Sequence, residues 1–167
     1  VNDGIWKMDS NVTLTAKWEI ITYNINYELN GGVNSNQNLQ NYNYEYSDIS
    51  IYNPTKTGYT FIGWKVNGEE ELVIEYVVKH NSLGNITLEA IFTPNTYKLT
   101  LDVNGGNSLE KDEIEIKYDE KLSLEVPNRT GYTFAGWYKE TSKVENGTWK
   151  YLENVTLTAK WNVINYN

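Results

Sequence analysis

The chain has no cysteine and a single histidine among its 167 residues. Without cysteine it can form no disulfide, and it offers neither a thiol nucleophile nor a thiolate metal ligand. The lone histidine, His80, excludes multi-histidine zinc sites and histidine-based catalytic triads within this chain. We therefore predict a chain that is not an enzyme and that requires no cofactor and no metal ion.

Long apolar runs and an excess of basic residues are also missing. No run of apolar residues approaches the roughly 18 needed for a membrane-spanning helix, and no secretory signal pattern opens the chain. Lysine and arginine together number 14 against 22 acidic residues, which gives a net charge of −8. Nucleic acids and anionic membranes bind basic surfaces, so we expect no nucleic-acid partner and no direct membrane insertion by this segment.

Period-two alternation between apolar and polar residues dominates the sequence. Residues 23–29 follow this pattern and residues 97–103 repeat it, which is typical of an antiparallel sheet with one face on a core. Asparagine and glycine both tolerate positive φ, and Asn-Gly steps mark turns at residues 30–31, 67–68, 104–105 and 146–147. Only residues 69–80 look helical, and their β-branched content favours a strand. We predict a mostly β fold, α+β at most, with antiparallel sheets and short helical turns.

The chain is built from repeats. Three motifs recur in the same order: Gly58–Trp64 as Gly131–Trp137, Asn30–Gly32 as Asn104–Gly106, and Val12–Trp18 as Val155–Trp161 and, more loosely, as Ile86–Phe92. Their spacing sets the repeat length at about 70 residues, the size of a small domain rather than of one solenoid turn. A residue that recurs in every copy is explained first by the fold, so only exposed or variable positions are free to carry individual functions.

The motifs divide the chain into four parts. Residues 1–18 are the C-terminal part of a preceding repeat, 19–93 and 94–161 are complete repeats, and 162–167 are the first strand of a following repeat. The chain starts without methionine and stops within a strand pattern, so we expect it to be a segment of a longer protein. The links at 19–21 and 93–95 contain no flexible Gly/Ser tract, which predicts closely coupled units in a semi-rigid rod.

The first 18 residues contain a strand bearing Trp6, a turn at residues 9–11 and the strand Val12–Trp18. An isolated two-stranded hairpin is marginally stable in water. We therefore expect this hairpin to be ordered by packing against the following unit. The alternative is pairing with another chain, as in a strand-exchange homodimer, because unpaired strand edges invite strand addition.

The ordered motifs resemble a known family over the whole chain. They are Pro54–Trp64 with Asn85–Phe92, and Gly131–Trp137 with Asn154–Trp161, each pair preceded by an alternating strand that ends in Asn-Gly-Gly. This order resembles the Listeria–Bacteroides repeat, which looks like the internalin B-repeat. The resemblance implies compact β-grasp-like domains, arrayed in tandem in secreted proteins of the bacterial cell surface or cell wall. It also implies a spacer, stalk or adhesion role and no catalytic constellation.

The residues of the recurrent motifs are expected to be structural, because equivalence between copies favours core packing over ligand binding. They are Gly58, Tyr59, Phe61, Gly63, Trp64, Gly131, Tyr132, Phe134, Gly136, Trp137, Trp18 and Trp161. Tyr42, Tyr44, Tyr46 and Tyr52 are less constrained, since the second copy carries Ile or Leu at several matching positions. We predict these four tyrosines as a binding platform for a glycan or for a host or bacterial surface protein. Such a binding module is the main alternative to a spacer.

Acidic residues offer weaker candidates. Glu69–Glu71 lie beside an Asn-Gly turn, where a solvated loop is expected and binding of a divalent cation or a cationic partner is the alternative. Asp102–Gly106 is similar to the start of a calcium loop, but Asn107 occupies the place of the required glycine. A glycosidase needs only two carboxylates, but a repeat of this size leaves little depth for a cleft. We therefore expect no calcium site and no glycosidase.

Two types of covalent modification are suggested by residue type. Lys17 and Lys160 could form isopeptide bonds with asparagine, but both lie on the outward register of their predicted strands. Asn11, Asn85 and Asn154 begin Asn-x-Thr sequons of the kind glycosylated in a eukaryotic secretory pathway. All three mark the same strand entry of the repeat, so we attribute their recurrence to the fold.

Overall fold

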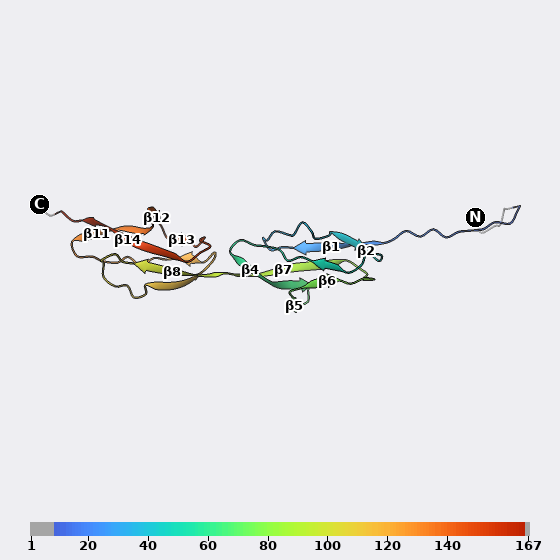
Figure 1. The fold of residues 1–167 in the computed structure, drawn as a ribbon, viewed down its shortest axis with the longest axis horizontal. Coiled ribbons are helices and arrows are strands. Elements are labelled where there is room, and N and C mark those ends of the chain that lie inside the picture. The colour runs from blue at the N-terminus through green and yellow to red at the C-terminus, as the bar shows by residue number, and fades with distance from the viewer. Residues whose placement is uncertain (1–8, 166–167) are drawn as a thin grey trace.

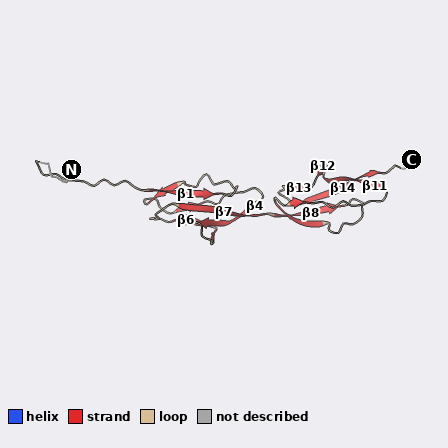
Figure 2. Ribbon diagram, turned by 180° about the vertical axis from the view of Figure 1, so that it is seen from behind, coloured by secondary structure: helices blue, strands red, loops and turns tan. Residues whose placement is uncertain are grey.

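The computed structural model describes residues 9–165, which form two β units joined end to end (Figure 1). All regular structure among these residues is β-strand, and Figure 2 shows strands without helices. The prediction of a mostly β fold is confirmed, whereas the short helical turns are absent from the described residues. Residues 69–80, the one helical candidate, instead contribute β5 and β6, as their β-branched side chains favour.

The two units have matching sets of strands. The first unit consists of β1 (Thr22–Glu28), β2 (Asn41–Asn43), β3 (Ile49–Ile51), β4 (Tyr59–Val66), β5 (Leu72–Val73), β6 (Tyr76–Val78) and β7 (Ile86–Pro94). The second consists of β8 (Thr96–Asp102), β9 (Glu113–Lys117), β10 (Lys121–Leu122), β11 (Tyr132–Lys139), β12 (Ser142–Val144), β13 (Gly147–Thr148) and β14 (Val155–Val163).

Each unit is organised around one five-stranded mixed sheet. The strand order is β2-β1-β7-β4-β5 in the first unit and β9-β8-β14-β11-β12 in the second, with a two-stranded sheet beside each. The first and last strands of a unit are neighbours and run parallel, β1 with β7 and β8 with β14. The expected antiparallel pairing therefore holds at the flanks of each sheet but not at its centre.

The parallel central pair determines where the chain enters and leaves each unit. Because the two strands point the same way, the start of the first strand and the end of the last strand lie at opposite poles. The second unit consequently continues beyond the first along one line, and the molecule is elongated (Figure 1).

Each unit has its own hydrophobic core. In the first unit the buried side chains are Ile25, Tyr42, Ile51, Trp64, Val78, Ile86, Leu88 and Ala90. In the second they are Leu99, Leu101, Ile116, Leu122, Trp137, Trp149, Val155, Leu157 and Ala159. Alternate positions of the central strands supply much of both cores, so the period-two pattern identified the buried face of these strands.

A glycine bulge recurs in both units and explains the Gly-Trp step. Gly63 and Gly136 have φ of 148° and 139°, and the register with the last strand shifts between Phe61 and Gly63 and at the same place in β11. A bulge inserts one extra residue into a strand, so side chains three positions apart can face the same side. Phe61 thereby meets Trp64 edge-on, with ring centroids 5.2 Å apart, and the equivalent pair in β11 is 5.6 Å apart.

The Asn-Gly-Gly turns are fixed by the last strand of each unit. Asn30 and Asn104 adopt φ of 48° and 46°, and each donates a side-chain hydrogen bond of 3.0 Å to an alanine carbonyl of that strand. A Cβ atom on the second glycine of either turn would lie within 2.8 Å of the terminal aromatic ring of the unit. Trp161, the terminal aromatic of the second unit, also donates its indole N–H to the Val103 carbonyl at 3.1 Å.

The predicted strand before the first unit does not form. Residues 9–21 contain no strand and are exposed, and Trp18 is 91% exposed, so its expected structural role is wrong. The equivalent strands β7 and β14 each have hydrogen-bonded neighbours on both sides, whereas residues 9–21 pair with no described strand and leave their backbone groups to water. Trp6 and the rest of the expected hairpin lie outside the described residues. At the other end, β14 extends to Val163, so residues 162 and 163 complete the second unit.

We expect strong alkali to destabilise the first unit before the second. Tyr27 donates its hydroxyl to the Leu39 carbonyl at 2.8 Å, and burial raises its pKa from 10.0 to about 12. Folding therefore favours the neutral phenol, and the stability it contributes is complete below pH 10 and is lost as pH rises through about 12. Leu101 occupies the equivalent position of the second unit, where no such loss arises.

Urea unfolding of the two units at pH 9 and above pH 11, followed by resolved NMR signals, measures this difference. Tyr27→Phe is the control and should reduce the alkaline loss of the first unit, leaving the smaller part that comes from the raised pKa values of Tyr42, Tyr59 and Tyr76. An equal loss of stability in both units would contradict the assignment to Tyr27.

Candidate functional site

The link between the two units is held by hydrogen bonds from both sides. Asn95, the residue between β7 and β8, donates its backbone N–H to the Gly58 carbonyl at 2.9 Å. Its own carbonyl accepts the Tyr118 N–H at 2.9 Å, and its side-chain oxygen accepts the Thr60 hydroxyl at 2.7 Å. Gly58 and Thr60 belong to the first unit and Tyr118 to the second, so the linking residue is tied to both.

Aromatic rings cover this link. Gly58 is buried with φ of 78°, and a Cβ atom at this position would lie only 2.2 Å from the nearest ring carbon of Tyr118. The Tyr118 ring also meets Tyr59 edge-on, with centroids 5.8 Å apart and an interplanar angle of 74°, an arrangement that the ring quadrupoles favour. Only glycine permits this approach, because any side chain would displace the ring.

Charged groups complete the contact. Tyr59 donates its hydroxyl to the Asp119 carboxylate at 2.8 Å, and Lys150 pairs with the other oxygen of the same carboxylate. The bonds from Lys150 and Tyr59 lower the pKa of Asp119, and the Asp119 bond raises the pKa of Tyr59. Lys56 lies 4.3 Å from the centre of the Tyr59 ring. We call the set Lys56, Gly58, Tyr59, Asn95, Tyr118, Asp119 and Lys150 the junction.

The four predicted platform tyrosines do not form one surface. Tyr42 is only 2% exposed and donates its hydroxyl to the Gly84 carbonyl at 2.7 Å, so the prediction that it offers an accessible ring is wrong. The strand β2 ends at Asn43, and the turn that follows breaks the alternation that directs Tyr42 inward. Tyr44, Tyr46 and Tyr52 are 52%, 42% and 50% exposed, respectively.

Two of the three exposed tyrosines share His80 as a neighbour. Tyr44 lies beside the His80 ring, with centroids 6.1 Å apart, and the Tyr46 carbonyl lies 2.8 Å from the His80 Nδ1. The backbone of Tyr52 is fixed by two hydrogen bonds to the Asn38 side chain, each 2.8 Å. No aromatic pair among the described residues joins any two of these three rings, so they offer individual contacts rather than a continuous stacking surface.

The acidic candidates form no cation site in the described part of the chain. No group of three or more His, Asp or Glu side chains gathers there as a metal ion would require. Glu70 pairs with Lys65 at 2.6 Å, and Asp102 caps its own turn by accepting the Asn104 N–H at 2.9 Å. The described residues also contain no helix of the length and apolarity needed to cross a membrane.

The recurrent sequon asparagines have a structural role in each complete unit. Asn85 accepts the backbone N–H of Asn24 at 2.9 Å, and Asn154 accepts that of Lys98 at 2.8 Å. Each side chain thus joins the entry of the last strand to the first strand of the same unit. Lys160, the isopeptide candidate, lies with its amine 4.1 Å from the centre of the Tyr138 ring.

Sequence reasoning missed the junction. Tyr118, Asp119 and Lys150 were not candidates, although a tyrosine followed by an acid recurs as Tyr44-Glu45 and Tyr118-Asp119. The recurrence of that dipeptide is the signal in the sequence that could have pointed to the junction. It is easily overlooked because the dipeptide lies outside the glycine-rich motifs and because Tyr44 belongs to the tyrosines predicted as a ligand platform.

A family model described as the Listeria-Bacteroides repeat domain matches residues 23–91 of this chain and again residues 97–160. A provisionally named membrane protein of Evansella cellulosilytica is 32% identical over 94% of this chain and 24% of its own length. A provisionally named Gly-rich membrane protein of the same organism is 29% identical, with coverage of 94% and 18%. Internalin H of Listeria monocytogenes is 32% identical over 65% of this chain and 20% of its own length.

The chain thus spans less than a quarter of the length of each of these relatives. No solved structure matches it. Both matched segments coincide with a complete β unit, so the repeat found in the sequence is also the unit of the structure.

Proposed function

Because the chain belongs to the Listeria-Bacteroides repeat domain family, we propose that its two units form a non-catalytic, semi-rigid spacer of an extracellular bacterial cell-surface or cell-wall protein. The junction carries this proposal. The residue that links the units is hydrogen-bonded to both, and a tyrosine ring and a carboxylate of the second unit rest on the first.

Geometry supports a spacer in a second way. In each unit the chain enters at one pole and leaves at the other, so adding units adds length (Figure 2). A flexible linker would let the ends approach each other, whereas the junction keeps the second unit in line with the first. The mixed sheet with its parallel central pair also supports a β-grasp-like description of each unit.

Adhesion is the second candidate function. The exposed rings of Tyr44, Tyr46 and Tyr52 support it, because aromatic side chains provide large contact areas for proteins and stack on sugars. Binding to a glycan array or to host surface proteins at micromolar concentration, lost in the Tyr46→Ala or Tyr52→Ala variant, would favour this candidate over a spacer alone.

Replacing Gly58 with valine is expected to make the rod flexible, because the new side chain would displace the Tyr118 ring from the junction. The chain has no cysteine, so spin labels can be placed at Ser50→Cys and Ser142→Cys, two exposed positions in different units. Pulsed electron–electron double resonance should give a narrow distribution of distances between the two labels in the parent protein. The Gly58→Val variant should broaden it by about twofold or more, as expected for a flexible link.

Gly131→Val is the matched control. Gly131 has nearly the same φ as Gly58, 82° against 78°, but a Cβ atom at this position would meet no described residue within 4 Å beyond its own chain neighbours. This variant should keep the narrow distribution. A broad distribution in the parent protein would overturn the spacer proposal, and a narrow one in Gly58→Val would show that the junction does not hold the units in line.

A further inference from the structure

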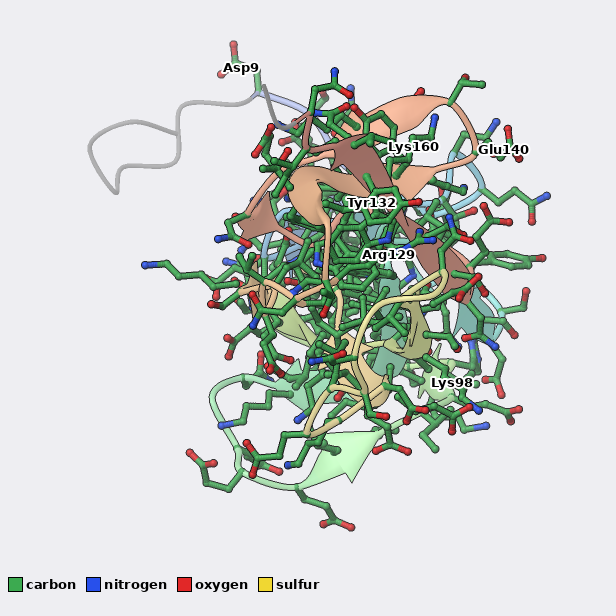
Figure 3. All side chains as sticks on the ribbon, turned by 90° about the vertical axis from the view of Figure 1, so that its left-hand side faces the viewer. Asp9, Lys98, Arg129, Tyr132, Glu140 and Lys160 are labelled. Atoms are coloured by element: carbon green, nitrogen blue, oxygen red, sulfur yellow. The ribbon has the colours of Figure 1, made fainter. Side chains whose placement is uncertain are left out.

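The far end of the second unit repeats the accepting half of the junction. Gly131 is the counterpart of Gly58, and its carbonyl accepts the Ile164 N–H at 2.9 Å, as the Gly58 carbonyl accepts that of Asn95. Arg129 lies 3.9 Å from the centre of the Tyr132 ring, in the place of Lys56 over Tyr59. Figure 3 looks onto this end of the molecule, where Arg129 and Tyr132 lie side by side. We call Arg129, Gly131 and Tyr132 the acceptor face.

The acceptor face is open where its counterpart is filled. Gly58 is buried under the Tyr118 ring, whereas Gly131 is partly exposed, and among residues 9–165 no atom lies within 4 Å of the position that a Cβ atom would take there, its chain neighbours aside. Tyr59, which donates its hydroxyl to Asp119, and Lys56, whose amine lies over the Tyr59 ring, have direct equivalents here in Tyr132 and Arg129. The face therefore offers a cation, a phenol hydroxyl and a bare glycine surface to a ligand that combines an aromatic ring with a carboxylate.

The first unit carries such a ligand at its opposite pole. Tyr44-Glu45 occupies the turn after β2, as Tyr118-Asp119 occupies the turn after β9. Both turns are closed by a backbone hydrogen bond across three residues, from Tyr46 to Asn43 at 3.2 Å and from Glu120 to Lys117 at 3.1 Å. Tyr118 is partly buried against Gly58, but Tyr44 is 52% exposed. We call Tyr44-Glu45 the donor turn.

We propose that the acceptor face is a docking site for the donor turn of a second copy of this chain that follows it in series. The Tyr44 ring would cover Gly131, and the Tyr132 hydroxyl would donate to the Glu45 carboxylate beside the Arg129 guanidinium. Acceptor and donor lie at opposite poles, so the contact is heterologous and does not close on itself. The inference rests on the proposed spacer function, because it extends the contact between the two units of one copy to the contact between successive copies.

The covalent connection between copies is part of the proposal. The acceptor is a small patch, and tethering raises the effective concentration of the donor turn. A protein in which residues 22–164 are duplicated, so that Thr22 of the second copy follows Ile164 of the first, creates one new junction of this kind. Spin labels at Ser142→Cys in the first copy and Ser50→Cys in the second copy report on it.

We expect a narrow distance distribution across the new junction in the duplicated protein. Gly131→Val in the first copy should broaden the distribution by about twofold or more, whereas the same substitution in the second copy, where the face is free, should leave it unchanged. Tyr44→Ala in the second copy should also broaden it, and Tyr44→Ala in the first copy should not. These paired variants separate a lost contact from a folding defect, since each substitution is present in both comparisons.

A broad distance distribution across the new junction of the duplicated protein would overturn the inference. So would a distribution that changes neither with Gly131→Val in the first copy nor with Tyr44→Ala in the second copy. The original junction is the internal reference, because labels at Ser50 and Ser142 of one copy measure it in the same protein. If that distance stays narrow while the new one is broad, the docking inference fails and the spacer proposal stands. If both are broad, the spacer proposal fails as well.

Discussion

Replacing Gly63 with valine is expected to lower the free energy of unfolding of the first unit by about 3 kcal/mol or more. Gly63 has φ of 148° at the bulge of β4, a backbone conformation that a β-branched residue strongly disfavours. A Cβ atom there would also lie 3.1 Å from the Leu72 Cβ, a position close to the backbone that cannot simply rotate away. Loss of the bulge would turn Phe61 and Trp64 to different faces and remove one from the core.

Calorimetric and NMR-monitored unfolding of the full chain measures this effect. Ile62→Val, at the neighbouring and partly exposed position of the same strand, is the control and should change stability little. Gly136→Val should disturb the second unit less than Gly63→Val disturbs the first, because its Cβ would meet the outer carbons of the flexible Lys143 side chain. Unchanged melting of both glycine variants would refute the explanation of the Gly-Trp step.

Leu157→Ala is expected to destabilise the second unit by about 3 kcal/mol, within the usual range for deleting a large apolar side chain from a core. Leu157 is the third residue of β14 and is 0% exposed. Truncation leaves a cavity that a small domain can fill only by shifting its central strand. Thr156→Ala, one residue earlier on the exposed face of the same strand, is the matched control.

The same unfolding experiment tests how far the two cores are independent. Since Leu157 belongs to the second cluster of buried residues and not to the first, the first unit should retain its own transition. A destabilisation of less than about 1 kcal/mol for Leu157→Ala would show that β14 is not the centre of a closely packed core.

Much of the fold could be predicted from the sequence because its signals are local. Period-two alternation identified the buried residues of β1, β7, β8 and β14. Alternation reports which face of a strand is buried, but not the direction of its neighbour. The parallel pairing of the first and last strands therefore could not be derived from it. The strand predicted at Val12–Trp18 failed for a related reason, since propensity cannot supply the two neighbours that such a central strand requires.

The junction could not be predicted because its parts are far apart in the sequence. Gly58 was identified as a motif residue, but the ring that covers it belongs to Tyr118 of the next unit. Nothing in the local pattern distinguishes Tyr42, which faces the core, from Tyr44, which lies in the turn after it. Only the end of β2 at Asn43 separates them, and strand ends are the least certain feature of a sequence-based prediction.

The parallel pairing of the first and last strands also determines how tension would pass along the molecule. A pull on the two ends of the chain draws β1 and β7 in opposite directions along their common axis, and it acts on β8 and β14 in the same way. The ladder between them, four residue pairs in each unit, is then loaded in shear, so its hydrogen bonds share the force instead of opening one after another. Each unit therefore has a built-in resistance to extension at the strand pair that also forms the centre of its core.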